Sequence, residues 1–267
     1  MRDLSSLADL SGRVAVITGG AGHLGRAMAI ALSKSGCTIV LIDRDPEVIE
    51  NARAELSASV STNIYAVTCD LENEEARVNM ARKVAVDHLK VDILINNAGF
   101  VGDNNLKGWT TPFTEQSIET WRRALEVNLT APFHLAQLFA PLLIASGKGS
   151  IVNISSIYGL LGPDMSLYDR TSMGNPAGYA ASKGGLIQLT RWLATTLAPR
   201  VRVNAISPGG IGRGQPESFV TQYIARTPLN RMGTEEDFLG VIAFLSSDLS
   251  AWVTGQNIIV DGGWSTW

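Results

Sequence analysis

Short runs of apolar and β-branched residues recur along the chain, and each has the length of a strand that is buried on both faces. The runs extend from Val14 to Thr18, Thr38 to Ile42, Ile64 to Cys69, Val91 to Ile95, Ile151 to Ile154, Val201 to Ile206 and Ile258 to Val260. Between them the apolar positions follow a helical period. After the first run, Leu24, Met28 and Leu32 share one helix face, and Gly36 follows as a stop signal.

This alternation predicts right-handed βαβ units and a doubly wound α/β fold, with a seven-stranded parallel sheet flanked by helices. At 267 residues, the chain is compatible with a single domain over residues 1–267. Ligands of such sheets bind at the carboxyl ends of the strands. Two long irregular segments, Phe100 to Thr114 and Leu161 to Gly178, follow predicted strands, so we expect both at the ligand-binding edge.

A glycine-rich turn, Thr18 to Gly25, directly follows the first predicted strand and opens the first predicted helix. Within it Gly20, Gly22 and Gly25 satisfy the pattern G-x-G-x-x-G. Glycine lets the backbone turn tightly and approach a pyrophosphate, whose charge then meets the helix N-terminus. The turn therefore predicts a dinucleotide site, and a glycine-rich turn without a ligand is the alternative.

Acidic residues end the second and third predicted strands. Asp43 follows Gly25 by 18 residues, close to the ~20 expected for a carboxylate that binds a ribose 2′-hydroxyl. Because an acid there repels a 2′-phosphate, the sequence favours NAD over NADP. Arg44 either pairs with such a phosphate, which leaves NADP possible, or is a solvated loop charge. Asp70 either accepts a hydrogen bond from the adenine amino group or caps the next helix.

Composition and charge exclude several classes of protein. The chain is 45% hydrophobic and 18% charged, with 22 basic and 25 acidic residues, so it is globular and lacks the basic face of a nucleic-acid-binding protein. Cys37 and Cys69 have no C-x-x-C spacing and no nearby histidine cluster, so we expect neither a disulfide nor a metal site. The sequence shows no signal peptide and no apolar stretch of the ~18 residues of a membrane helix, so we expect a cytoplasmic protein without membrane contact.

Tyr179 and Lys183 have the spacing of one helical turn at the start of an apolar segment, so their side chains share one helix face. Four further motifs end predicted strands or lie near the C-terminus: Asn96-Asn97-Ala98-Gly99, Ser155-Ser156, Asn204 to Gly209, and Val253 to Gly263. Together with the glycine-rich turn and Val127-Asn128, they resemble the short-chain dehydrogenase/reductase family over nearly the whole chain. The resemblance implies a Rossmann-type fold.

The resemblance implies four catalytic residues: Ser156, Tyr179, Lys183 and Asn128. Hydride transfer at a carbinol carbon requires one proton to move at the oxygen, and a tyrosine can carry it. An ammonium one turn away stabilises the phenolate, so we expect Lys183 to lower the pKa of Tyr179. We expect Ser156, rather than Ser155, to bind the substrate oxygen, and Asn128 to hold a water that relays protons to Lys183, unless it serves only helix packing.

The resemblance also implies a set of cofactor contacts along the carboxyl edge. We expect NAD or NADP to meet Gly19, Gly20, Gly22, His23, Leu24, Gly25, Asp43, Arg44, Asp70, Leu71, Asn97, Ala98, Gly99, Lys183, Pro208, Gly209 and Ile211.

The chain departs from the family pattern at three places. His23 replaces the middle glycine of the turn, Arg213 stands where a threonine is common, and Tyr179 follows Ser156 by 23 positions, about ten more than in compact members. We expect this insertion to border the substrate.

These features predict an NAD(H)-dependent oxidoreductase that interconverts a secondary alcohol and a ketone. The polar residues of the two long segments favour a small, hydroxylated, sugar-like substrate: Asp103, Asn104, Asn105 and Lys107, then Asp164, Tyr168, Asp169, Arg170 and Asn175. The alternatives are a 3-oxoacyl thioester (acyl-carrier-protein) reductase and a non-catalytic dinucleotide-sensing protein. Trp264 and Trp267 suggest a homotetramer or homodimer, unless the C-terminus packs into its own core.

Overall fold

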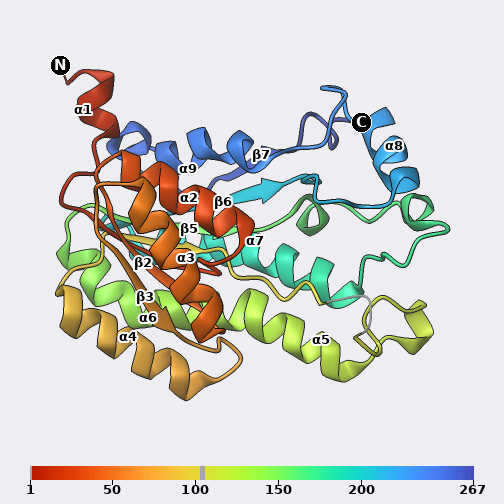
Figure 1. The fold of residues 1–267 in the computed structure, drawn as a ribbon, viewed down its shortest axis with the longest axis horizontal. Helices are drawn as coiled ribbons and strands as arrows, with labels where there is room; N and C mark the ends of the chain where they lie inside the picture. The colour runs from red at the N-terminus through yellow and green to blue at the C-terminus, as the bar shows by residue number, and fades with distance from the viewer. Residues whose placement is uncertain (1, 103–105) are drawn as a thin grey trace.

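The computed structural model describes residues 2–102 and 106–267, so the predicted loop residues Asp103, Asn104 and Asn105 lie outside the described part of the chain. Its centre is a fully parallel sheet of seven strands in the order β3-β2-β1-β4-β5-β6-β7 (Figure 1). The strands are β1 (Val14–Thr18), β2 (Thr38–Asp43), β3 (Ile64–Thr68), β4 (Ile93–Asn96), β5 (Gly149–Ile154), β6 (Val201–Pro208) and β7 (Asn257–Val260). The predicted doubly wound fold is confirmed.

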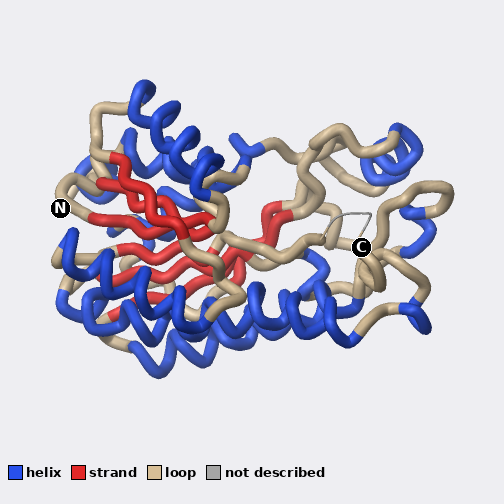
Figure 2. The backbone as a smooth tube through the Cα atoms, turned by 60° about the horizontal axis from the view of Figure 1, so that its bottom comes forward, coloured by secondary structure: helices blue, strands red, loops and turns tan. Residues whose placement is uncertain are grey.

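The helices are α1 (Leu4–Ala8), α2 (His23–Lys34), α3 (Pro46–Ser59), α4 (Glu74–His88), α5 (Ile118–Leu125), α6 (Ala131–Ala145), α7 (Ala177–Leu197), α8 (Glu217–Ala225) and α9 (Leu239–Ser246). Shorter helical turns are η1 (Phe113–Glu115), η2 (Glu126–Thr130), η3 (Ile157–Gly159), η4 (Met165–Tyr168), η5 (Glu235–Phe238) and η6 (Asp248–Ser250). Figure 2 shows the strands between two helical layers, with long loops gathered beyond one end of the sheet.

Two apolar cores lie on opposite faces of the sheet, because successive side chains of a strand point to opposite sides. In β1, Ile17 packs into the core under α2, α3 and α9, whereas Val16 packs into the core under α4, α6 and α7. Both side chains are fully buried. This explains why the strands appear in the sequence as continuous apolar runs rather than as alternating ones.

One long helix covers residues 118–145, made of α5, the π-helical turn η2 and α6. By length and composition alone it could cross a membrane, with a mean hydropathy of 1.4. In the fold it packs against α4 and α7. The buried Arg77 of α4 pairs with Glu126 at the start of η2 and donates a hydrogen bond to His134 of α6. Buried polar contacts therefore hold this helix in the core of the fold.

The C-terminus folds back onto the loops beyond the sheet. Trp264 is buried and stacks on Tyr223 of α8 with ring centroids 5.6 Å apart. Of the two explanations considered for this residue, oligomer contact or packing into the chain's own core, the structure shows packing into the core. Trp267 is 82% exposed.

Cys37 and Cys69 are buried free thiols, and burial raises the pKa of Cys69 to about 11.

Candidate active site

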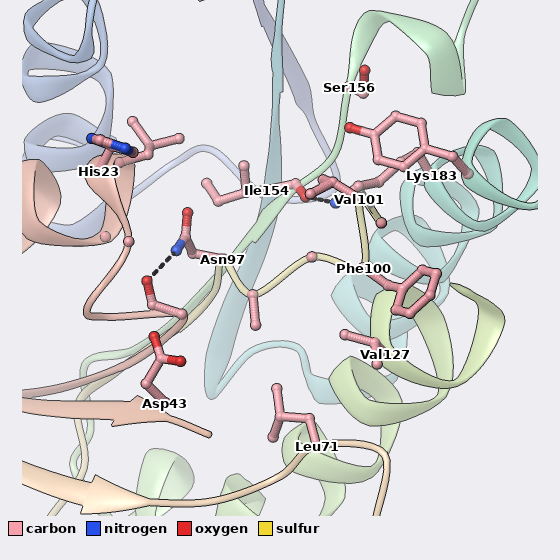
Figure 3. Close-up of a pocket in the computed structure, with 18 of the residues that line it drawn as sticks. His23, Asp43, Leu71, Asn97, Phe100, Val101, Val127, Ile154, Ser156 and Lys183 are labelled. Carbon is pink, nitrogen blue, oxygen red and sulfur yellow. Dashed lines mark hydrogen bonds between the residues drawn. The ribbon is translucent and has the colours of Figure 1, made fainter. Parts of the chain in front are cut away.

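A cleft of about 860 Å³, which we call the main cleft, runs along the carboxyl ends of the central strands. Figure 3 shows His23 and Asp43 towards one end and Ser156 and Lys183 at the other. Every predicted site residue lines it except Gly20 and Asn128. The motifs that are dispersed in the sequence therefore meet in one place.

The glycine-rich turn is closed by contacts that leave no room for side chains at particular positions. Gly19 has a φ of +62°, and a Cβ there would lie 2.8 Å from Ala98 Cα. A Cβ on Gly25 would penetrate the Gly19 carbonyl oxygen. By contrast, a Cβ on Gly22 would lie 3.3 Å from that oxygen, and Gly22 has the ordinary φ of −73°. A Cβ on Gly20 would lie 2.9 Å from Leu41 Cδ2, so Gly19, Gly20 and Gly25 are the most constrained glycines of the turn. Gly22 lines the main cleft, and its contact with the cofactor stays a prediction.

Asp43 at the end of β2 faces the turn. Its carboxylate accepts hydrogen bonds from Ala21 N at 3.1 Å and from Arg44 N at 2.8 Å, which fixes its orientation beside α2. The Arg44 side chain is exposed and lines the same end of the main cleft. Asp70 accepts from Glu72 N at 2.9 Å, while Asn73 is the cap of α4, so Asp70 does not cap that helix.

The end of β4 is locked to β1 by side-chain bonds. Thr18 Oγ1 accepts from the backbone N–H groups of Asn97 and Ala98, each at 3.1 Å, and Asn97 Nδ2 donates to the Thr18 and Gly19 carbonyls. These bonds hold Asn97, Ala98 and Gly99 against the floor of the main cleft. Gly99 lies next to Asn128 and Lys183, since a Cβ on it would lie 3.8 Å from Asn128 Oδ1 and from Lys183 Nζ, which is an ordinary contact.

Asn128 is fully buried in η2 and does not line the main cleft. Its Oδ1 accepts from Phe100 N at 2.6 Å, and its Nδ2 donates to Ser182 Oγ at 3.0 Å and to Phe100 O at 3.3 Å. The side chain thus joins the segment after β4 to α7. This network matches the packing role that we considered, and the water relay stays a prediction.

The two serines that end β5 differ in their contacts. Ser155 Oγ donates to Lys183 O at 2.8 Å, so it fastens α7 to the sheet. Both serines line the main cleft, and Ser156 Oγ accepts from Tyr158 N at 3.2 Å and hydrogen-bonds the phenol of Tyr179. The preference for Ser156 over Ser155 as the residue facing a substrate agrees with this geometry.

Lys183 is 3% exposed, and its Nζ donates to Ile154 O at 2.7 Å and lies 5.7 Å from the centroid of the Tyr179 ring. Burial lowers the pKa of Lys183 to about 8. The pKa of Tyr179 is raised, because burial outweighs the opposing hydrogen bond from Ser156. The expected lowering of the pKa of Tyr179 by Lys183 is therefore wrong for this structure, since removal of the phenol from water dominates.

Sequence reasoning missed a polar cluster on the helix that carries Asn128. Arg123 lines the main cleft, lies 4.8 Å from the Phe100 ring centroid, and pairs with Glu72 at 2.8 Å. This pair lowers the pKa of Glu72. Arg123 and Val127 are four residues apart and both line the main cleft, so helical spacing from the Val127-Asn128 motif was the available signal.

The insertion between Ser156 and Tyr179 does not line the main cleft in the described part of the chain. It packs instead on α8 and the C-terminus through a cluster of Leu167, Tyr168, Phe219, Tyr223 and Trp264. Tyr168 ends the short turn η4 and donates to Tyr158 Oη at 2.7 Å. Arg213 also lines the main cleft and pairs with Glu235 at 3.1 Å.

Among the described residues, no group of three or more histidine, cysteine, aspartate or glutamate side chains could hold a metal ion.

A family model described as enoyl-(acyl carrier protein) reductase matches residues 19–265. With this match, the parallel sheet and the gathered motifs, the fold and site define an oxidoreductase of the Rossmann type. The chain belongs to the short-chain dehydrogenase/reductase family, whose members act on CH–OH groups with NAD or NADP.

Relatives with different substrates are about equally similar. The chain is 34% identical to a 3-oxoacyl-[acyl-carrier-protein] reductase of Thermotoga maritima, with 95% of this chain and 98% of that protein aligned. It is 33% identical to galactitol 2-dehydrogenase (L-tagatose-forming) of Cereibacter sphaeroides, with 99% and 100% aligned. The structure of NAD⁺-bound xylitol dehydrogenase is similar, with 32% identity, a TM-score of 0.84 and 95% and 99% coverage.

Proposed function

We propose that this enzyme oxidises a secondary alcohol of a neutral polyol to a ketone with NAD⁺, and catalyses the reverse reaction. The observation that carries the proposal is the meeting of Ser156, Tyr179 and Lys183 at one end of a cleft whose other end has the glycine-rich turn and Asp43. This arrangement joins a site for proton transfer to a site for a dinucleotide. It favours an enzyme over a protein that only senses the dinucleotide.

The main cleft fits a dinucleotide by its own chemistry. Gly19 and Gly25 let the turn close tightly against the β4 end and the start of α2, and the first residues of α2 line the main cleft, where a helix N-terminus suits a pyrophosphate. The oriented carboxylate of Asp43 suits a ribose diol and disfavours a 2′-phosphate. When bound, the nicotinamide accepts or supplies the hydride. NAD is the proposed preference, and Arg44 is the residue through which NADP would be tolerated.

We assign the proton transfer at the substrate oxygen to the phenol of Tyr179, with Ser156 donating a hydrogen bond to the same oxygen. A raised pKa keeps Tyr179 protonated at neutral pH, so it is ready to donate a proton to a ketone. Lys183 is anchored to Ile154 O and would reach the phenol and the nicotinamide ribose. Asn128 positions both the Phe100 backbone and α7.

Turnover of an alcohol library with NAD⁺ and with NADP⁺ tests the proposal. We expect polyols to be the preferred substrates and NAD⁺ the preferred cofactor. Asp43→Ala should weaken NAD⁺ binding and reduce the preference by about tenfold, because it removes both the ribose acceptor and the repulsion of a phosphate. Asp87→Ala, on an exposed part of α4, is the control. Tighter binding of NADP⁺ by the wild type would contradict the cofactor assignment.

Reduction of 3-oxoacyl thioesters is the second candidate, since the relative from Thermotoga maritima is named for it. Turnover of a 3-oxoacyl thioester with NADPH above that of every polyol would replace our proposal.

We also propose a homotetramer or homodimer in the cytoplasm. Trp192 and Trp252 are 54% and 100% exposed, which is costly in a monomer, and light scattering would test the assembly.

A further inference from the structure

A second cavity of about 250 Å³ lies between the two long loops that follow β4 and β5. One wall comes from residues 109–116 and the other from residues 165–176. The walls are tied together, since Gln116 Oε1 accepts from Ala177 N at 3.0 Å and Gly174 packs against Thr110. The second cavity is lined by Trp109, Thr110, Thr111, Pro112, Gln116, Met165, Tyr168, Asp169, Met173, Gly174, Asn175 and Pro176.

Three of its lining residues connect it directly to the catalytic end of the main cleft. Trp109 Nε1 donates to the carbonyl of Val101, a residue that lines the main cleft. Tyr168 donates to Tyr158 Oη, and Tyr158 N donates to Ser156 Oγ. Pro176 is the cap of α7 and precedes Tyr179 by three residues. The second cavity therefore lies beside the catalytic end of the main cleft, although the two share no lining residue among the described part of the chain.

The lining has the chemistry of a site for a neutral, hydroxylated chain. Aromatic, methionine and proline side chains offer apolar faces to C–H groups, and threonine and amide side chains can exchange hydrogen bonds with hydroxyls. The described lining holds one carboxylate, Asp169, and no lysine or arginine. This charge distribution disfavours a phosphate or carboxylate group.

Each wall also contributes one buried oxygen that lacks a hydrogen-bond partner among the described residues, Thr111 Oγ1 and Asn175 Oδ1. Buried polar atoms in folded proteins almost always have partners. Both oxygens are covered in this conformation, so a hydroxyl group in the second cavity could supply the missing bond only after a rotation of the side chain.

We propose that the second cavity binds the end of the substrate remote from the reacting carbon, and that this end is a neutral chain bearing hydroxyl groups. The proposal rests on the proposed function, because it extends the substrate from Tyr179 into a second space. In this proposal the insertion between Ser156 and Tyr179 lies outside the main cleft, and it selects substrates by their length and charge through the second cavity.

The test compares galactitol, with six carbons, and erythritol, with four, on two matched variants. Thr110→Trp fills the second cavity, and Thr114→Trp makes the same change at an exposed position of η1 outside both cavities. Calorimetric titration in the presence of NADH measures binding, and oxidation with NAD⁺ measures KM. We expect Thr110→Trp to weaken galactitol about tenfold, since overpacking of this size excludes the ligand. Erythritol, and every value for Thr114→Trp, should match the wild type.

Thr111→Val provides a variant that removes only a hydroxyl without a partner, so it should fold as the wild type does. We expect it to weaken galactitol and not erythritol. Equal binding of galactitol by all four proteins, no binding to the wild type, or equal losses for both polyols would overturn the proposal. A change of assembly state in Thr110→Trp with unchanged galactitol binding would assign the second cavity to contact between copies of the chain. Absence of any turnover would contradict the proposed function, whereas the calorimetric comparison would still decide the second cavity.

Discussion

The two ends of the main cleft are built in different ways. At the cofactor end, the Thr18 hydroxyl and the Asn97 amide bond backbone groups of the β4 end and of the β1 turn, and at the glycines of the turn an added Cβ would collide with backbone atoms. Beyond the substrate end, the insertion between Ser156 and Tyr179 packs on a separate cluster with α8 and Trp264. The cofactor end is thus constrained by main-chain geometry, which a short motif can encode. The shape of the substrate end depends on side chains that are distant from one another in the sequence and belong to no short motif.

Removal of the Tyr179 hydroxyl should distinguish the two ends of the main cleft most clearly, because it should affect catalysis and leave cofactor binding unchanged. Tyr179→Phe is expected to lower kcat by roughly 10² to 10⁴, since it deletes the proton-transfer group. NAD⁺ affinity measured by fluorescence titration should remain, because the cofactor end is untouched. Tyr65→Phe, on β3 beside His88, is the control. A kcat close to that of wild type would show that another group carries the proton.

The cofactor end can be broken by a single methyl group. Gly25→Ala would push against the Gly19 carbonyl, so we expect NAD⁺ binding to weaken about tenfold or more. Gly22→Ala is the matched control, because a Cβ there meets only a 3.3 Å neighbour at an ordinary φ. Titration of both variants tests the assignment. If Gly22→Ala is the more damaging of the two, the turn has a different conformation when the cofactor binds.

The pH dependence of the two directions should differ at the substrate end. Because burial raises the pKa of Tyr179, the phenol is protonated at neutral pH, as ketone reduction requires. Alcohol oxidation needs the phenolate, so its kcat/KM should rise with pH by up to about tenfold per unit between about pH 6 and 7.5. Lys183, with a pKa of about 8, stays mainly charged over this window. Oxidation rates that are flat there would contradict the assignment.

The smallest expected effect concerns the support of the substrate-end loops. Asp164, before η4, pairs with Arg226 after α8, and both side chains are partly exposed. Arg226→Ala should cost less than about 1 kcal/mol of unfolding free energy, and lower Tm by at most about 4 °C, because such pairs are screened by water. Arg53→Ala, in the exposed pair on α3, gives the comparison. A much larger loss would mean that this pair, rather than the apolar cluster, holds the loops.

The five inner strands could be predicted closely because continuous burial leaves a clear apolar signal. The edge strands β3 and β7 are only partly buried, so the expectation of burial on both faces was wrong for them. β1 matches its predicted residues, whereas β4 begins at Ile93 instead of Val91, and β6 continues to Pro208. These ends depend on backbone hydrogen bonds with neighbouring strands, such as Gly209 N to Val260 O at 2.9 Å, which hydrophobicity does not report.

The meeting of Ser156, Tyr179 and Lys183 in one cleft could be predicted, because these residue types are tied to motif positions, while their catalytic roles stay a proposal. Its electrostatics were not, because the pKa of Tyr179 depends on burial in the folded chain. Arg123 with Glu72, and the walls of the second cavity, are joined by residues 51 or more positions apart. No periodic pattern records such contacts.

The π-helical turn at Glu126–Thr130 makes one stretch of this chain tolerant of a change in length. A π turn holds one residue more than the regular helix around it. Deleting one residue there would give an unbroken α-helix in which α5 and α6 keep nearly the same faces towards their neighbours, because the wider turn already absorbs the extra residue. The same deletion in the regular helix between Arg123 and the π turn would rotate Arg123 by about 100° relative to α6 and carry it out of the main cleft. We therefore expect the site to survive a single-codon deletion at the π turn better than one in the last turn of α5.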